Sequence, residues 1–144
     1  MAQYEHLPIY KAAFDLNLYI EQIVRNFSRY HKYTLGTELR ERARDVVKLI
    51  VRANNAPKDD ASQRQTVLQQ LREELEQLKL TVRLCKEVKA FHNFKSYQVA
   101  INQVITLSKQ NEGWLKSLSQ ANGQVVFDEE PAADGRSQPQ TDRA

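Results

Sequence analysis

The histidines and the single cysteine are the residues of this 144-residue chain that could do metal or nucleophilic chemistry. His6, His31 and His92 fall in three separate segments, and none forms the His-x-x-x-His or Glu-x-x-His spacing of a metal site on helices. Cys85 belongs to an apolar repeat, where a thiol behaves as a small hydrophobic side chain, and one cysteine allows no internal disulfide. We therefore expect no metal site and no nucleophile.

The acidic and glycine residues show no catalytic pattern either. Glu73, Glu74 and Glu76 cluster, but on the solvated side of the same repeat rather than paired in a pocket. Neither G-x-x-x-x-G-K-[ST] nor G-x-G-x-x-G occurs, so no phosphate-binding loop is expected. The sequence predicts a protein that is not an enzyme and has no catalytic residue and no cofactor.

Basic residues give a stronger signal. Between residues 79 and 89 there are four bases against one acid, a surplus that local ion pairs do not explain. Bases in a row along a helix can follow a phosphate backbone, so the sequence predicts contacts with nucleic acid. The predicted contacts are Arg72, Lys79, Arg83, Lys86 and Lys89, followed by a second row of Arg40, Arg44 and Arg52. The alternative is a solvated helix face, where ion pairs such as Glu76–Lys79 contribute only about 0.2–0.5 kcal/mol each.

Four amphipathic helices are expected to position these rows, because apolar residues recur at intervals of three and four. The first is predicted from Pro8 to Phe27, followed by a loop from Ser28 to Tyr33 that carries Arg29, His31 and Lys32. The predicted bounds of the others are Thr34 (as the N-cap) to Asn54, Asp59–Asp60 to a frayed end at 90–93, and Ser96 to Ala121, with a stop at Asn122–Gly123. Asp60 and Gln63 stand in capping-box register.

The third helix has the most regular seam, with the intervals 3, 4, 3, 4, 3 of a heptad repeat. Its members are Leu68, Leu71, Leu75, Leu78, Val82 and Cys85. With short connections, four such helices predict an all-α, antiparallel up-down-up-down four-helix bundle over residues 1–123. Gly113 inside the fourth helix is expected to let a neighbouring helix approach beside Trp114.

The first and fourth helices carry more apolar surface than one core needs, which predicts a subunit contact. The residues in surplus are Ile9, Tyr10, Phe14, Tyr19, Ile101 and Ile105.

Charge divides the chain into a basic body and an acidic tail. Residues 124–144 hold five acids and two bases, a charge of −3, which leaves +6 on the body from 19 bases and 13 acids. The composition of this tail predicts disorder. No apolar run approaches a membrane span and no signal peptide is recognised, so a cytoplasmic location without membrane contact is expected.

Two stretches carry a family likeness. The run from Tyr30 to Arg40 (YHKYTLGTELR), with its continuation through Ala43 to Asn55, resembles the second helix of four-helix-bundle proteins related to those encoded in 23S rRNA intervening sequences. It is more similar still to the accessory variability determinant (Avd) proteins of diversity-generating retroelements. Gly113-Trp114-Leu115 matches the last helix of that family, and the likeness covers residues 4 to 120.

The resemblance implies a homopentameric ring of bundles with a basic outer surface. It also implies two partners, a reverse transcriptase and its structured template RNA or RNA/DNA, during mutagenic copying in which the polymerase supplies the catalytic residues. The eight bases named above are the matching candidates for these contacts. The acidic tail is not part of the family pattern.

Two other functions remain open. In one, the chain is a structural homo-oligomer or protein-interaction module, whose bases pair with Glu73, Glu74 and Glu76 of a neighbouring subunit and ignore nucleic acid. In the other, the bundle binds a ligand in an internal cavity, which the well-filled leucine seam disfavours.

Overall fold

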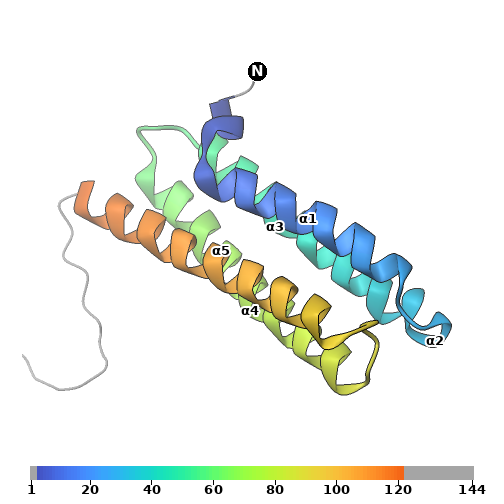
Figure 1. The fold of residues 1–144 in the computed structure, drawn as a ribbon. Coiled ribbons are helices and arrows are strands. Elements are labelled where there is room, and N and C mark those ends of the chain that lie inside the picture. Colours follow the sequence, from blue (N-terminus) through green and yellow to red (C-terminus); the bar gives the residue numbers. More distant parts are fainter. Residues whose placement is uncertain (1–2, 122–144) are drawn as a thin grey trace, which may run out of the picture.

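The computed structural model describes residues 3–121 of the chain. The elements, in chain order, are η1 (Gln3–His6), α1 (Pro8–Arg25), α2 (Arg29–Lys32), α3 (Leu35–Asn55), α4 (Ala61–Glu87) and α5 (Phe94–Ala121). The four long helices run antiparallel in sequence order (Figure 1). The predicted all-α four-helix bundle is therefore confirmed for these residues, in which no strand occurs. The predicted acidic tail, 124–144, and the predicted stop at Asn122–Gly123 lie outside them.

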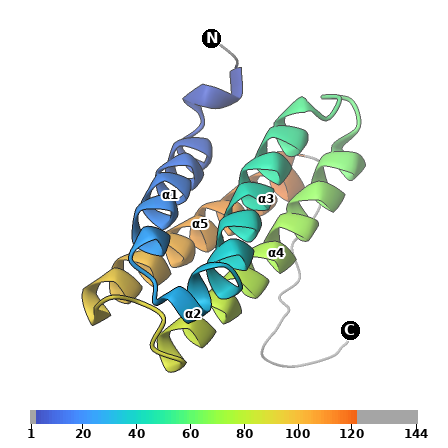
Figure 2. The same cartoon turned by 90° about the vertical axis from the view of Figure 1, so that its right-hand side faces the viewer.

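Each long helix packs against two others. α1 contacts α3 and α5, and α4 contacts the same two helices, so α1 and α4 occupy diagonally opposite corners of the bundle. Figure 2 shows that α2 and the α4–α5 connection lie at the same end, because both follow helices that run in the same direction. None of the helices in residues 3–121 has both the length and the apolar composition that crossing a bilayer requires.

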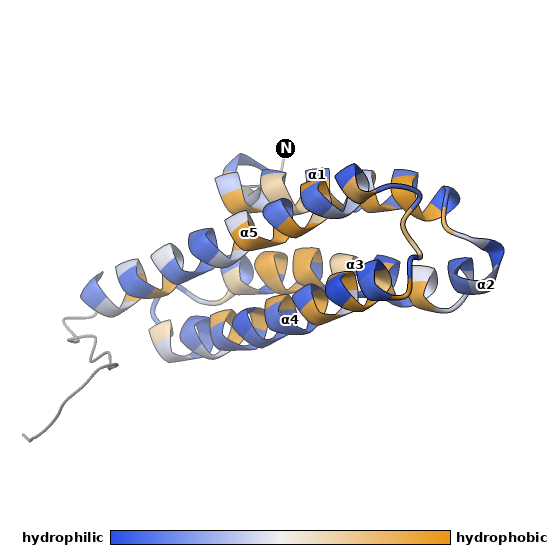
Figure 3. Cartoon of the chain, turned by 60° about the horizontal axis from the view of Figure 1, so that its bottom comes forward, coloured by the Kyte–Doolittle hydropathy of each residue, from blue (hydrophilic) through white to orange (hydrophobic). Residues whose placement is uncertain are grey.

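The core lies along the bundle axis, where apolar stripes of all four long helices meet (Figure 3). All six members of the predicted α4 seam are buried, with at most 1% of each side chain exposed. They pack with residues such as Leu16 of α1, Leu39 of α3 and Leu107 of α5. Each fully buried leucine contributes about 1.5–3 kcal/mol, so this seam is a major source of stability. On α5, Leu115 is buried in the core, whereas the neighbouring Trp114 is only partly buried.

Of the two N-caps predicted from the sequence, the one before α4 forms its side-chain hydrogen bond and the one before α3 does not. Asp60 accepts a hydrogen bond from the backbone N–H of Gln63 at 3.0 Å, which confirms the predicted cap of α4. Thr34 precedes α3 as predicted, but its hydroxyl lies 3.4 Å from two carbonyl oxygens of the preceding turn and caps nothing. That turn is α2, which forms inside the connection expected to be a loop.

The start of α5 uses a cap that the sequence analysis missed. Asn93 Oδ1 accepts hydrogen bonds from the backbone N–H and the hydroxyl of Ser96, at 2.8 and 3.1 Å. The helix therefore begins at Phe94, two residues before the predicted start.

Two asparagines, one partly and one fully buried, tie helices together by hydrogen bonds. Asn17 of α1 donates to the carbonyl of Ala43 in α3 at 2.8 Å. Asn111 of α5, 1% exposed, donates to the carbonyl of Leu68 in α4 at 3.1 Å. Since a buried amide is costly without its partner, these bonds fix the axial register of the helices.

Gly36 and Gly113 are both helical glycines, but only Gly36 is needed for packing. A Cβ added to Gly36 would lie 2.8 Å from Cγ1 of Val24 and 3.4 Å from Phe27, so α1 and α3 approach closely there. A Cβ at Gly113 would meet nothing within 4 Å. The expectation that Gly113 lets a helix of this chain approach beside Trp114 is therefore wrong.

These two glycines give a matched pair of substitutions. Gly113→Ala is expected to raise the free energy of unfolding by about 1 kcal/mol, because alanine favours the helix and meets no neighbour. Gly36→Ala should lower it by about 1 kcal/mol or more, since the stiff, buried Val24 side chain must move. Urea unfolding of both variants measures the difference, and equal stabilities would contradict the close approach at Gly36.

Candidate nucleic-acid interface

The eight bases predicted as contacts are not equivalent in the structure. Five of them make ion pairs: Lys86 with the adjacent Glu87, and four others that lie two on each side of the bundle. Arg72 of α4 donates two hydrogen bonds to Glu112 of α5, at 2.7 and 2.8 Å, and Lys79 pairs with Glu76 at 2.7 Å. Arg40 and Arg44 of α3 share Glu21 of α1, at 2.9 and 3.4 Å.

Arg40, Arg44 and Arg72 each pair with an acid of a neighbouring helix, whereas Lys79 and Glu76 both belong to α4. The bidentate bond to Glu112 raises the pKa of Arg72, and the local field there is close to balanced. Arg42 bridges Glu38 and Glu74, at 3.2 and 3.1 Å. Burial by itself would lower the pKa of Arg42, but its hydrogen bonds to these two carboxylates raise it.

Lys86 and the remaining three predicted contacts lie at the two ends of the bundle. Arg83, Lys86 and Lys89 follow one another at the C-terminal end of α4, and all three are exposed. Arg52 is exposed in the last turn of α3, at the opposite end. The structure therefore brings three of the eight residues together and separates Arg52 from them.

The end that holds the α1–α3 and α4–α5 connections is strongly basic, and we call it the basic end. Residues 22–37 and 83–97, which form it, contain seven bases and one acid, Glu87. Lys86 lies 3.4 Å from Glu87, and within the described part of the chain the other six bases make no ion pair. The seven are Arg25, Arg29, Lys32, Arg83, Lys86, Lys89 and Lys95.

Sequence reasoning missed Arg25 and Lys95 and left Arg29 and Lys32 in a loop without a role. The signal was present as two stretches without acids, residues 22–37 and 88–111. Antiparallel topology brings the first stretch and the start of the second to the same end of the bundle.

Lys89 occupies an unusual backbone position at the basic end. Its φ is 61°, in the left-handed region that glycine normally fills after a helix. Its N–H donates to the carbonyl of Lys86 at 3.0 Å, and the N–H of Ala90 donates to that of Cys85 at 2.8 Å. These two bonds are the Schellman motif that ends α4. A lysine with this positive φ lowers the stability of the fold by about 1 kcal/mol compared with a residue in an unstrained conformation. Its charge partly offsets this, because it lies at the negative end of the helix dipole.

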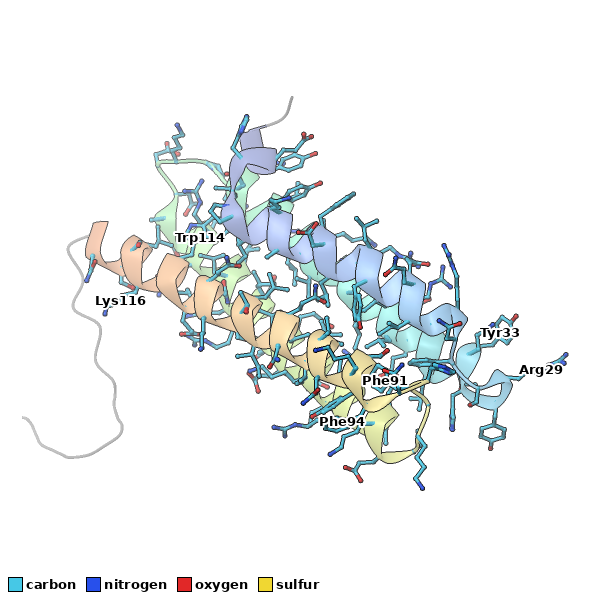
Figure 4. The ribbon with its side chains drawn as sticks, in the orientation of Figure 1. Arg29, Tyr33, Phe91, Phe94, Trp114 and Lys116 are labelled. Atoms are coloured by element: carbon cyan, nitrogen blue, oxygen red, sulfur yellow. The ribbon has the colours of Figure 1, made fainter. Side chains whose placement is uncertain are left out.

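Exposed aromatic rings accompany the cations. Tyr30 is 84% exposed, Tyr33 75% and Phe94 59%, which makes them the three most exposed large apolar side chains of the described residues. Figure 4 shows Tyr33 and Phe94 at this end with Arg29, while Lys116 is at the other.

A shallow pocket of about 220 Å³ lies among α1, α2 and α3 at the same end. Three cations contribute to its wall, together with one carboxylate, one tyrosine and one valine. They are Arg25, Lys32, Arg40, Glu21, Tyr33 and Val24.

Two apolar stripes lie on the surface of the bundle, one along α1 and one along α4, and the second enters the basic end at its last two residues. On α1, Phe14 and Leu18 are 48% and 56% exposed, and the ring of Tyr10 stacks on Phe14 at 6.0 Å. On α4 and at its C-cap, the exposed large apolar residues are Leu80, Leu84 and Val88, which the sequence analysis missed. We call these sets the α1 stripe and the α4 stripe; they belong to diagonally opposite helices.

The other residues expected in surplus divide between core and surface. Ile9 is buried, and Tyr10, Tyr19 and Ile101 are partly buried against the core. Ile105 is 37% exposed.

The residues with possible catalytic chemistry are not assembled into a site. Cys85 is buried, and burial, with a smaller contribution from the charge of Glu38, raises the pKa of its thiol to about 12. The sulfur therefore stays protonated at neutral pH, as expected for a core residue. Within residues 3–121, no three histidine, cysteine or acidic side chains lie close enough to hold a metal ion.

The fold and this surface define a class of protein: an antiparallel four-helix bundle that gathers exposed cations and aromatic rings at one end. A family model described as bAvd-like matches residues 9–118, which is most of the chain. The chain belongs to the bAvd-like family, and the resemblance seen in its sequence is confirmed. A comparison with curated proteins gave no match.

The positive φ of Lys89 predicts that removing this lysine and removing a helical lysine change the stability in opposite directions, although both remove one positive charge. Lys89→Gly is expected to raise the free energy of unfolding by about 0.5–1 kcal/mol, because glycine adopts a positive φ without strain. Lys86→Gly removes the same charge from a helical position and should lower it by about 1 kcal/mol. Urea unfolding tests both, and Lys89→Ala controls for loss of the side chain. A Lys89→Gly variant no more stable than Lys89→Ala would contradict the assigned strain.

Proposed function

We propose that this chain is a non-catalytic, nucleic-acid-binding accessory protein. In this proposal it partners a reverse transcriptase and its template RNA in the mutagenic copying carried out by a diversity-generating retroelement. The observation that carries the binding role is the basic end, with seven bases against one acid. The retroelement role is supported by membership of the bAvd-like family and by the resemblance of residues 30–55 to Avd proteins.

The basic end has the electrostatics that binding to phosphates requires. Six of its cations have no acidic partner in the described structure, so their charge is available to a ligand. Each phosphate that a lysine or arginine neutralises releases condensed counterions, which makes the affinity fall with salt. The paired arginines in the middle of the bundle, Arg72 among them, would first have to leave their carboxylates. The contacts are therefore expected to concentrate at the end rather than along the rows.

Binding is expected to depend on the charge at the basic end and not on total charge. The triple variant Arg83→Gln, Lys86→Gln, Lys89→Gln should reduce the slope of log affinity against log salt by about 2–3, at roughly 0.7–0.9 per charge. Fluorescence anisotropy with structured RNA over a salt series measures this slope.

The matched control removes three exposed charges from the opposite end, with Arg52→Gln, Lys58→Gln and Lys116→Gln. It has the same net charge and should keep most of the affinity. Equal losses in the two triple variants would mean that only net charge matters. If the unaltered protein fails to bind at the lowest salt, the nucleic-acid role is excluded and only a role through the polymerase is left.

A second role, assembly into a homo-oligomeric ring, is supported by the two apolar stripes. Exposed stripes of this size on a small domain mark protein contacts. Because they lie on opposite corners, the α1 stripe of one copy can pack on the α4 stripe of the next, and such head-to-tail contacts close into rings. The family resemblance gives five as the proposed number of subunits. A purely structural scaffold would use these stripes and leave the basic end without a ligand.

Head-to-tail assembly predicts an unusual result for two single variants. Leu18→Glu and Leu84→Glu should each give monomers, because each puts a charge into every interface of the ring. Mixed together, they should form heterodimers, since one copy keeps an intact α4 stripe and the other an intact α1 stripe. Light scattering after gel filtration measures the masses.

Ile105→Glu, on α5 and outside both stripes, is the control and should leave the oligomer unchanged. If both stripe variants kept the mass of the unaltered protein, assembly through these stripes would be excluded.

A further inference from the structure

The three most exposed large apolar side chains of residues 3–121 are aromatic, and all three lie at the basic end. Tyr30 and Tyr33 come from α2 and the residue after it, and Phe94 begins α5. The proposed subunit contact does not account for them, because none of the three belongs to either apolar stripe. Aromatic rings left in water among cations are the arrangement that binds unpaired nucleotides, with bases stacked on the rings and phosphates on the cations.

We propose that the basic end binds single-stranded RNA or DNA by stacking unpaired bases on Tyr30, Tyr33 and Phe94. This inference rests on the proposed function, in that the chain must bind nucleic acid, and it adds which form is bound. A duplex hides the faces of its bases, so stacking on these rings requires a strand that is unpaired. Phosphate contacts alone would not distinguish the two forms.

The pocket among α1, α2 and α3 places cations beside one of these rings. Arg25, Lys32 and Tyr33 all line it, so a base stacked on Tyr33 brings its phosphate next to two positive charges. Arg40 completes the wall and is oriented by its bond to Glu21 at 2.9 Å. The pocket therefore suits the sugar-phosphate that follows a stacked base.

Phe94 is held in place by a row of rings that begins in the core. Buried Phe27 packs edge-on against Phe91 at 5.3 Å, Phe91 against Tyr97 at 5.9 Å, and Tyr97 against Phe94 at 5.6 Å. Lys86 lies 5.3 Å from the centre of the Tyr97 ring, so that ring already has a cation. Phe94 is the exposed outer member of the row, which gives a positioned platform at little cost in side-chain entropy.

The first test compares a single strand of about 15 nucleotides with the matching duplex, by fluorescence anisotropy. The unaltered protein should prefer the single strand. Tyr30→Leu, Tyr33→Leu and Phe94→Leu keep the charge and much of the apolar volume, and each should weaken single-strand binding by about tenfold. Duplex binding and the salt slope should not change, because no phosphate contact is removed. Ile105→Ala, at an exposed apolar side chain on α5 outside both stripes and away from the basic end, is the control and should have no effect.

A second variant reports stacking directly. Trp114 is the only tryptophan, so Tyr33→Trp in a Trp114→Phe background puts the single indole at the pocket. Its fluorescence should be quenched when the single strand is added and not when the duplex is added. An indole that is unaffected by the single strand would overturn the stacking at Tyr33.

The remaining outcomes separate this inference from the proposed function. Salt-dependent binding that is equal for both forms and insensitive to the leucine variants would overturn stacking and leave the nucleic-acid role intact. No binding to either form at low salt would overturn both. Vesicles containing phosphatidylserine are a third probe: binding to them that is lost in the leucine variants, without single-strand preference, would assign the aromatic rings to a lipid surface instead.

Discussion

The buried leucine seam of α4 is the constraint on which the rest of the structure depends. It contacts α3 and α5 directly and completes the core beneath α1, so it fixes how the four helices surround their axis. Asn111 bonds to the backbone of Leu68 within this seam and sets the register of α5. Once the helices are antiparallel and in register, their connections must meet at two ends. The position of the cations is a consequence of that packing.

Ion pairing explains why the basic end carries more uncancelled positive charge than the sides of the bundle. Along the sides of the bundle, acids such as Glu21 and Glu112 face arginines of neighbouring helices, and each pair is half-exposed. Pairs of this kind add little to stability, about 0–1 kcal/mol, but they cancel charge. In residues 22–37 and 83–97 the only acid is Glu87, and Glu21 on the wall of the nearby pocket is already paired with Arg40 and Arg44, so most of the positive charge of the basic end is not cancelled. The surface that remains electropositive is the one formed by the connections.

Local patterns in the sequence determined most of the fold, while features that depend on distant partners could not be predicted. The seam and the Asp60 cap follow from spacings of three and four residues, and both are observed. The ion pairs of Arg40 and Arg72 join residues 19 and 40 positions apart, so they depend on how the helices are rotated against one another. For the same reason, the sequence does not reveal which bases of the two predicted rows are already paired with acids. The α2 turn was missed because its four residues, all polar or aromatic, carry no apolar period.

Assembly and nucleic-acid binding, which the sequence left as alternatives, are compatible in this structure. The α4 stripe enters the basic end at Leu84 and Val88, but the exposed rings and the cations of the α1–α3 connection belong to neither stripe, so the two roles use different side chains. In the proposed ring, rotation about an axis parallel to the bundles would carry every basic end to the same rim. A strand long enough to reach two neighbouring ends would then bind the second without a further loss of freedom, and such linkage raises affinity by about 10²–10⁴. A basic end that binds weakly in one copy can therefore hold a strand firmly when the copies are assembled.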